Sequence, residues 1–258
     1  MGVFSNLKRT KDMEQATDYV GGSFLLDSDV YEAKVLSAYS DNFASGAQFV
    51  QLKLNVKKQD GSWQEYNERL TVTNRDGAIF YVGKDGKHHA LPGYQMLEDI
   101  ARLVLDKSVD ELEPVKKVLP IYNAKEGKEL PTEVDYIEEL VGADILVAIS
   151  KVRANKQEKG DNGEYVNTSE ERHYNAIQKF LDPEYKTTVI EMMNAMDKGI
   201  EFKDVTPKFY NDWIEKYQGK EQDKYVEVSG SSSSASFGGN TGGAASSAKS
   251  RVFGRKSA

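Results

Sequence analysis

The clearest pattern in the chain is a strict alternation of apolar and polar side chains over residues 48–58. Alternation with a period of two predicts a strand with one buried and one solvent-facing side. The side expected to be buried carries Val50, Leu52, Leu54 and Val56. The side expected to face solvent carries Phe49, Gln51, Lys53, Asn55 and Lys57.

An antiparallel partner is predicted immediately after this strand. Residues 59–62 contain the dipeptide Asp60-Gly61, which is typical of a tight turn, and residues 63–73 return with Leu70 and Val72 expected to face inward. The outward side of this returning strand is expected to carry Trp63, Arg69, Thr71 and Thr73.

Three further strands and three helices are predicted from composition and spacing. Residues 29–43 are rich in Val, Tyr and Phe, residues 142–156 begin with an apolar run, and residues 165–181 return after a Gly-rich turn. Helices are expected where apolar residues recur at helical spacing, over residues 94–106, 187–198 and 206–219. For the last of them Thr206 is expected as N-cap and Pro207 as the first helical residue.

The order strand, strand, strand, helix, strand, strand indicates a mainly β fold, a five-stranded OB-type barrel with an inserted helix. We expect a polar leader at 1–22, the barrel at 23–183, a short helical segment packed on it at 184–226, and a disordered Ser/Gly-rich tail at 227–258. Residues 107–140 are interrupted by prolines and are expected to form an irregular insertion.

Composition and charge limit the classes of protein to which the chain can belong. The 258-residue chain has no cysteine, which excludes disulfides and thiolate metal sites, and no window approaches the length of a membrane span. The net charge of -7 argues against a nucleic-acid binder. The charge is unevenly spread, because the tail from Ser229 onward is basic and acids cluster within 99–139, while several predicted strands are locally basic.

Sites for catalysis, metals or cofactors are not expected. The segment around Gly83 to His88 lacks the glycine spacing of a phosphate-binding P-loop. His88 and His89 have no third ligand nearby in sequence, and His173 stands alone, so these histidines favour surface roles. The carboxylates leave a two-metal nuclease unsupported.

Four segments resemble the single-stranded-DNA-binding proteins of tailed bacteriophages, especially those of N4-like podoviruses. They are AQFVQLKLNVKKQDGSWQEY (47–66), GADILVAISKVRANK (142–156), ERHYNAIQKFLDP (171–183) and TPKFYNDWIEKYQGK (206–220). The resemblance implies an OB fold that coats single-stranded DNA during phage DNA replication, recombination and repair, in the cytoplasm of a bacterial host.

Binding of single strands without sequence preference needs cations for phosphates and aromatic rings on which bases stack. The residues expected to contact DNA lie on the predicted strands, although aromatic residues in strands more often pack in a core. They are Tyr39, Phe43, Phe49, Lys53, Lys57, Trp63, Arg69, Lys151, Arg153, Tyr174 and Lys179.

The chain ends SRVFGRKSA, where such proteins commonly end in an acidic tail with a terminal aromatic residue. Arg251, Phe253, Arg255 and Lys256 are therefore expected to bind a partner, for example a replication or transcription polymerase. Two alternatives stay open. The protein could be an OB-fold adaptor that acts through its tail, or a recombination protein that anneals strands.

Overall fold

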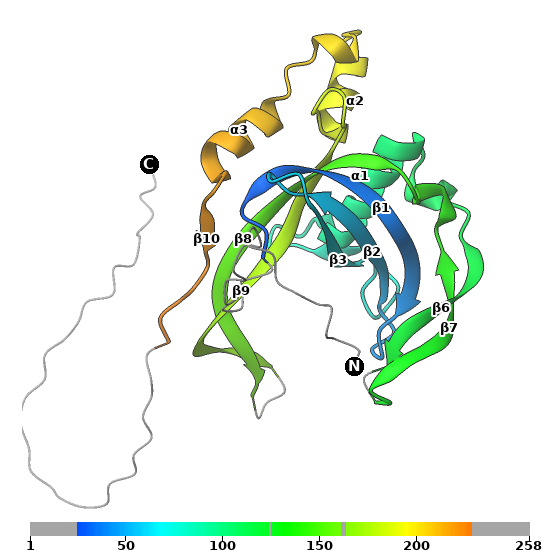
Figure 1. Cartoon of the computed structure of the whole chain (residues 1–258), viewed down its shortest axis with the longest axis vertical. Coiled ribbons are helices and arrows are strands. Elements are labelled where there is room, and N and C mark those ends of the chain that lie inside the picture. The colour runs from blue at the N-terminus through cyan, green and yellow to red at the C-terminus, as the bar shows by residue number, and fades with distance from the viewer. Residues whose placement is uncertain (1–24, 124, 161–163, 229–258) are drawn as a thin grey trace, which may run out of the picture. The chain divides into compact units, whose positions relative to one another are not determined.

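The computed structural model describes residues 25–123, 125–160 and 164–228, and these residues form a mainly β structure (Figure 1). The expected leader at 1–22 and the partner-binding residues Arg251, Phe253, Arg255 and Lys256 lie outside the described residues, as does almost all of the expected tail. No helix in the described ranges is long and apolar enough to cross a membrane.

The first three strands along the chain pair antiparallel: β1 (Asp29–Asn42), β2 (Gln48–Lys57) and β3 (Trp63–Thr71). The predictions for these strands are confirmed to within two residues at each end. The β2–β3 turn is set by Asp60, whose Oδ1 accepts a hydrogen bond of 2.8 Å from the Ser62 amide, and by Gly61 at φ +80°. A positive φ is the conformation that glycine adopts without steric cost.

The core lies on the inner side of these strands, as the alternation predicts. The inward residues of β2 are buried, together with Leu70 and Val72 on the returning chain. Helix α1 (Pro92–Leu105) covers this side with Leu97 and Ile100, close to the predicted helix at 94–106. Burial of each large aliphatic side chain contributes about 1.5 to 3 kcal/mol.

Two long strands complete the sheet, β8 (Asp144–Lys159) and β9 (Tyr165–Leu181), which pair antiparallel as predicted. β8 also pairs with the first half of β1, so the strand order is β9-β8-β1-β2-β3. The short strand β10 (Glu221–Asp223) pairs parallel with residues 151–153 of β8, just past the part of β8 that pairs with β1. No ladder between described residues joins β3 to β9, and α1 contacts both of these strands instead.

The expectation of an irregular segment at 107–140 is wrong, because most of it forms the hairpin of β6 (Val115–Asn123) and β7 (Lys128–Tyr136). The hairpin was not predicted because each of its strands contains a proline, which usually interrupts a strand. Pro120 lies opposite Pro131, where neither strand has another strand on its second edge among the described pairings. Proline is tolerated at such edge positions because its missing N–H removes no ladder hydrogen bond there.

Other short elements surround the sheet. A small hairpin of β4 (Phe80–Val82) and β5 (His88–Ala90) precedes α1. Single turns of 3-10 helix, η1 (Val109–Glu111) and η2 (Glu138–Leu140), flank the β6–β7 hairpin. β7 joins the far half of β1 through Tyr136 and Asp135, which pair with Tyr39 and Ser40.

The C-terminal helices are α2 (Val189–Asp197) and α3 (Lys208–Tyr217), with η3 (Phe202–Asp204) between them. Trp213 of α3 is only 4% exposed and packs on Leu146, Ala148 and Leu181 of the sheet. The expected capping by Thr206 is wrong, because the N-cap is Pro207 and no side chain caps this end. The aromatic stripe of α3 therefore forms a second, small core on the side of the sheet opposite α1.

Candidate nucleic-acid interface

The candidate site is the side of β1, β2 and β3 that faces away from the core, called the outer face below. The strand register aligns its side chains in rows across the three strands. From one end of the strands to the other the rows are Asp41-Phe49-Thr71, Tyr39-Gln51-Arg69, Ser37-Lys53-Asn67, Lys34-Asn55-Glu65 and Glu32-Lys57-Trp63.

The register thus brings together six of the residues expected to contact DNA. Tyr39, Phe49, Lys53, Lys57, Trp63 and Arg69 all belong to the outer face. Because residues directly opposite one another on antiparallel strands share one side of the sheet, this grouping follows from the pairing itself.

The lysines of the outer face are paired with acids. The Nζ of Lys53 lies 2.8 Å from Glu65, that of Lys57 lies 2.8 Å from Glu32, and that of Lys34 lies 3.0 Å from Asp144. Such exposed pairs contribute about 0 to 1 kcal/mol. A phosphate can therefore replace the carboxylate as partner at little cost.

Arg69 is held differently. Its Nε donates a hydrogen bond of 3.2 Å to Gln51 Oε1, and its guanidinium carbon lies 4.5 Å from the ring centroid of Phe49 and 5.7 Å from that of Phe43. No acid pairs with Arg69 among the described residues. This cation is thus oriented by aromatic rings and remains available to an anion.

Phe49 corrects a sequence expectation. It was expected on the solvent-facing side of its strand as a stacking surface, yet it is only 6% exposed. Phe43, whose ring centroid lies 4.6 Å away, and Arg69 cover it. In this structure Phe49 offers little ring surface to a base and instead supports the guanidinium of Arg69.

The β6–β7 hairpin closes one end of the outer face into a groove of about 390 Å³. Tyr39, Gln51 and Lys53 line its floor, and Leu119, Pro120, Ile121 and Tyr136 line the hairpin side. Lys117 Nζ lies 4.0 Å from the ring centroid of Tyr136. Burial raises the pKa of the Tyr39 hydroxyl above its ordinary value.

Sequence reasoning missed these hairpin residues. Leu119 and Ile121 recur at alternate positions, but Val118 beside them is apolar as well, so the segment lacks a clear alternation, and its prolines are typical of breaks. Nothing in the sequence places Tyr136 beside Tyr39, because that pairing joins positions far apart in the chain.

Trp63 lies at the opposite end of the outer face and is 50% exposed. It lines a second groove of about 360 Å³ together with Val30, Lys186 and Tyr210. Lys186 Nζ lies 4.7 Å from the ring centroid of Tyr210. An aromatic ring and a cation therefore occur at each end of the face, and Tyr210 and Lys186 are a contribution that the sequence did not indicate.

Apart from Phe43, which follows β1, the remaining expected contact residues lie on β8 and β9. Arg153 forms ion pairs with Glu171 and, at 3.1 Å, with Asp223, while Lys151 lies 3.2 Å from Asp27. Tyr174 is directly opposite Val152, so it projects from the other side of the sheet than Arg153 does.

Lys179 points away from the outer face. Its Nζ lies 2.7 Å from Asp99 on α1, and both side chains are largely buried. The described contacts of Lys151, Arg153, Tyr174 and Lys179 involve neither β2 nor β3. The structure therefore does not join these four residues to the outer face.

The histidines considered as metal ligands have other contacts. His88 stacks on Phe80 at 4.1 Å between ring centroids, His89 bonds to Asp85 at 2.9 Å, and His173 bonds to Glu221 at 2.9 Å. No group of three or more His, Cys, Asp or Glu residues that could hold a metal ion occurs in the part of the chain that the structure describes.

Comparison of the chain with models of known protein families found no match, and comparison with curated proteins found no relative.

Proposed function

We propose that this protein binds single-stranded DNA without sequence preference along the outer face. The observation that carries the proposal is the combination of Lys53, Lys57 and Arg69 with exposed Trp63 on one side of one sheet. Cations along a groove and aromatic rings for stacking are the two requirements of such binding.

The strand order supports the proposal. Along the chain the antiparallel strands β1, β2 and β3 are followed by α1 and then by the antiparallel pair β8 and β9. β1 pairs with both β2 and β8. This is the order of the five-stranded OB fold. In that fold the side of the second and third strands binds oligonucleotides. We infer an OB-type barrel that α1 completes between β3 and β9.

The negative total charge is compatible with this function, because affinity for phosphates depends on the local groove. On the outer face the lysines hold acids only through exposed pairs. An arriving strand exchanges these pairs for phosphate contacts and releases its own counterions. The acids that remain weaken binding to any polyanion that offers no unstacked bases, which favours single strands over duplex.

The resemblance of four segments to phage single-stranded-DNA-binding proteins supports a role in phage DNA metabolism. We propose that the protein coats displaced strands during phage DNA replication, recombination and repair in the cytoplasm of a bacterial host, without a catalytic activity or cofactor of its own.

The test is fluorescence anisotropy of a labelled oligo-dT with the full chain, with duplex DNA as control and salt varied. We expect preference for the single strand and affinity that falls steeply with added salt. Trp63→Ala should weaken binding about tenfold, within the roughly 1 to 3 kcal/mol of one base stack.

The matched control is Tyr122→Ala. Tyr122 is also an exposed aromatic residue, at 65% against 50% for Trp63, but it is next to Ile121 of the groove and so points to the other side of the β6–β7 hairpin. Equal affinity for duplex, binding that ignores salt, or equal effects of the two substitutions would overturn the proposal.

A further inference from the structure

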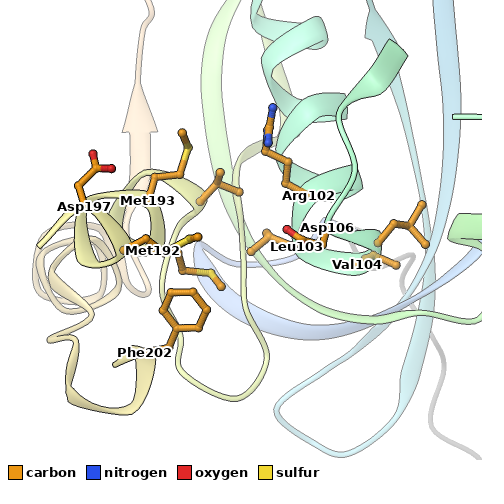
Figure 2. A pocket seen from close by; sticks show the side chains of 11 residues that line it. Arg102, Leu103, Val104, Asp106, Met192, Met193, Asp197 and Phe202 are labelled. Atoms are coloured by element: carbon orange, nitrogen blue, oxygen red, sulfur yellow. The ribbon is translucent and has the colours of Figure 1, made fainter. Parts of the chain in front are cut away.

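A second surface, unrelated to the outer face, is an apolar groove between the end of α1 and α2. Its volume is about 650 Å³. Figure 2 shows Met192 and Phe202 on one side of the space and Leu103 on the other. The lining also includes Val104, Leu105, Val189, Met193 and Met196.

The apolar side chains around α2 are unusually exposed. Met196 is 66% exposed and Met193 is 51% exposed, and Ile190 and Ile200 are also exposed. An exposed apolar patch with a polar rim is typical of an interaction site. Methionine is suited to such a surface because its flexible thioether adapts to different partners.

The cap and the buried side chains of α2 do not include Met193 or Met196. The helix is capped by Thr188 and Glu191, and Glu191 Oε1 also accepts a hydrogen bond of 2.8 Å from the Phe209 amide of α3. Val189 and Ala195 are its buried residues. The helix is therefore anchored through its start and one side, while the methionine side is left toward solvent.

The charges at the groove are mainly negative. Asp106 and Asp197 have no ion-pair partner among the described residues, whereas Arg102 is held by Glu98 at 2.6 Å. The groove thus combines an apolar floor with an acidic rim. A complementary partner presents apolar side chains flanked by cations.

The walls of the groove also restrict the backbone of the partner. The groove is walled by α1 and α2, with Phe202 from η3, and none of these elements offers a strand edge on which a β-strand could add. Recognition must rely on side chains, as in the docking of an amphipathic helix into a groove.

We propose that the groove between α1 and α2 binds an amphipathic helix of a partner protein, with an apolar stripe flanked by Lys or Arg. Such a site would recruit a protein to DNA that the outer face holds, and the two surfaces are separate. The groove does not require the proposed DNA binding to be correct.

The probe is a labelled peptide of about 18 residues, or five helical turns, with Leu at positions i, i+3, i+4 and i+7 and Lys elsewhere. A peptide of the same composition in scrambled order is its control, because it has the same charge but no stripe. We expect the full chain to bind the striped peptide at least tenfold more tightly.

Variants locate the binding. Met193→Gln combined with Met196→Gln should remove the tenfold preference, while Asn194→Ala, at an exposed position of the same helix, should leave it unchanged. Asp106→Asn with Asp197→Asn should weaken the striped peptide several-fold. Oligo-dT affinity should be the same in all of these variants, which separates this proposal from the DNA-binding one.

Four results would overturn the proposal. The first two are equal binding of the two peptides and an unchanged preference for the striped peptide in the double-methionine variant. The third is a dimer of the wild-type chain that the double-methionine variant makes monomeric, which would show that a second copy occupies the groove. The fourth is a tenfold gain in peptide affinity on deleting 229–258, which would show that the chain's own tail occupies it.

Discussion

The guanidinium carbon of Arg69 on β3 lies 4.5 Å from the ring centroid of Phe49 on β2, and the Nε of Arg69 donates a hydrogen bond to Gln51, which lies directly opposite Arg69 on β2. Phe49 is almost fully buried, so its role on the outer face is to orient a cation. A cation above an aromatic ring gains about 0.5 to 1 kcal/mol at an exposed site.

Phe49→Leu should therefore lower the affinity for oligo-dT about two- to fivefold, although Phe49 itself has little surface for DNA. A double-mutant cycle with Arg69→Ala is the measurement. We expect Phe49→Leu to have almost no further effect once Arg69 is removed, because the two residues act as a unit. Additive effects would mean that Phe49 contributes independently.

Removal of an acid from the outer face should strengthen DNA binding. Glu65→Gln removes the carboxylate that Lys53 must give up, at 2.8 Å, before it can contact a phosphate. We expect affinity for oligo-dT at fixed salt to rise by up to about fivefold, the equivalent of an exposed ion pair of up to about 1 kcal/mol. Glu129→Gln, on the β6–β7 hairpin away from the outer face, changes the total charge equally and should leave the affinity nearly unaltered.

The β6–β7 hairpin should contribute to binding but little to folding. Val118 lies opposite Glu133, so residues 119–132 can be replaced by an Asn-Gly turn that keeps this pair joined. The groove loses Leu119, Pro120 and Ile121, and oligo-dT affinity should fall about tenfold. Thermal unfolding followed by circular dichroism should occur near the wild-type temperature, because the pairing of the hairpin base with β1 is retained. Unchanged oligo-dT affinity would show that the DNA does not pass through the groove.

Close packing of α1 on β3 should make Gly93 intolerant of a side chain. A Cβ at this position would lie 2.3 Å from the backbone oxygen of Thr71 and 2.6 Å from its backbone nitrogen. Since backbone atoms cannot step aside, Gly93→Ala should lower the free energy of unfolding by about 3 kcal/mol or more. Urea denaturation measures this, with Gln95→Ala at an exposed position of the same helix as the control.

The ion pair of Arg153 and Glu171 should be visible in a titration. The hydrogen bond from Arg153 lowers the pKa of Glu171 below its ordinary value. A depressed carboxyl pKa adds stability above the ordinary pKa, and that stability is lost as pH falls through the folded-state pKa. Arg153→Gln should raise the pKa of Glu171 toward its ordinary value.

Carbon-13 NMR of the carboxyl groups checks this expectation, and Glu170 is an internal control. The pKa of Glu170 is lowered mainly by its hydrogen bond with Lys156, so it should not move when Arg153 is replaced. An unchanged Glu171 pKa would show that the pair does not persist in solution.

Local patterns in the sequence were sufficient for the strands of the central sheet and for the grouping of Lys53, Lys57, Trp63 and Arg69. Alternation along a strand assigns each side chain to one side of a sheet, and the Asp60-Gly61 turn aligns β3 against β2. Both depend on neighbours in the chain. The same local rules failed at the β6–β7 hairpin, because proline is a breaker in the interior of a sheet but not at an unpaired edge.

What only the tertiary structure decided was the surroundings of these side chains. Lys179 had the same local signal as Lys53, yet it turns to Asp99, a residue eighty positions earlier on α1. Phe49 is covered by Phe43 and Arg69, and Tyr136 reaches Tyr39 through a pairing between distant segments. A periodic sequence determines which way a side chain points from its own strand. It does not determine which distant residue lies there to meet it, since that depends on how the whole chain closes around its core.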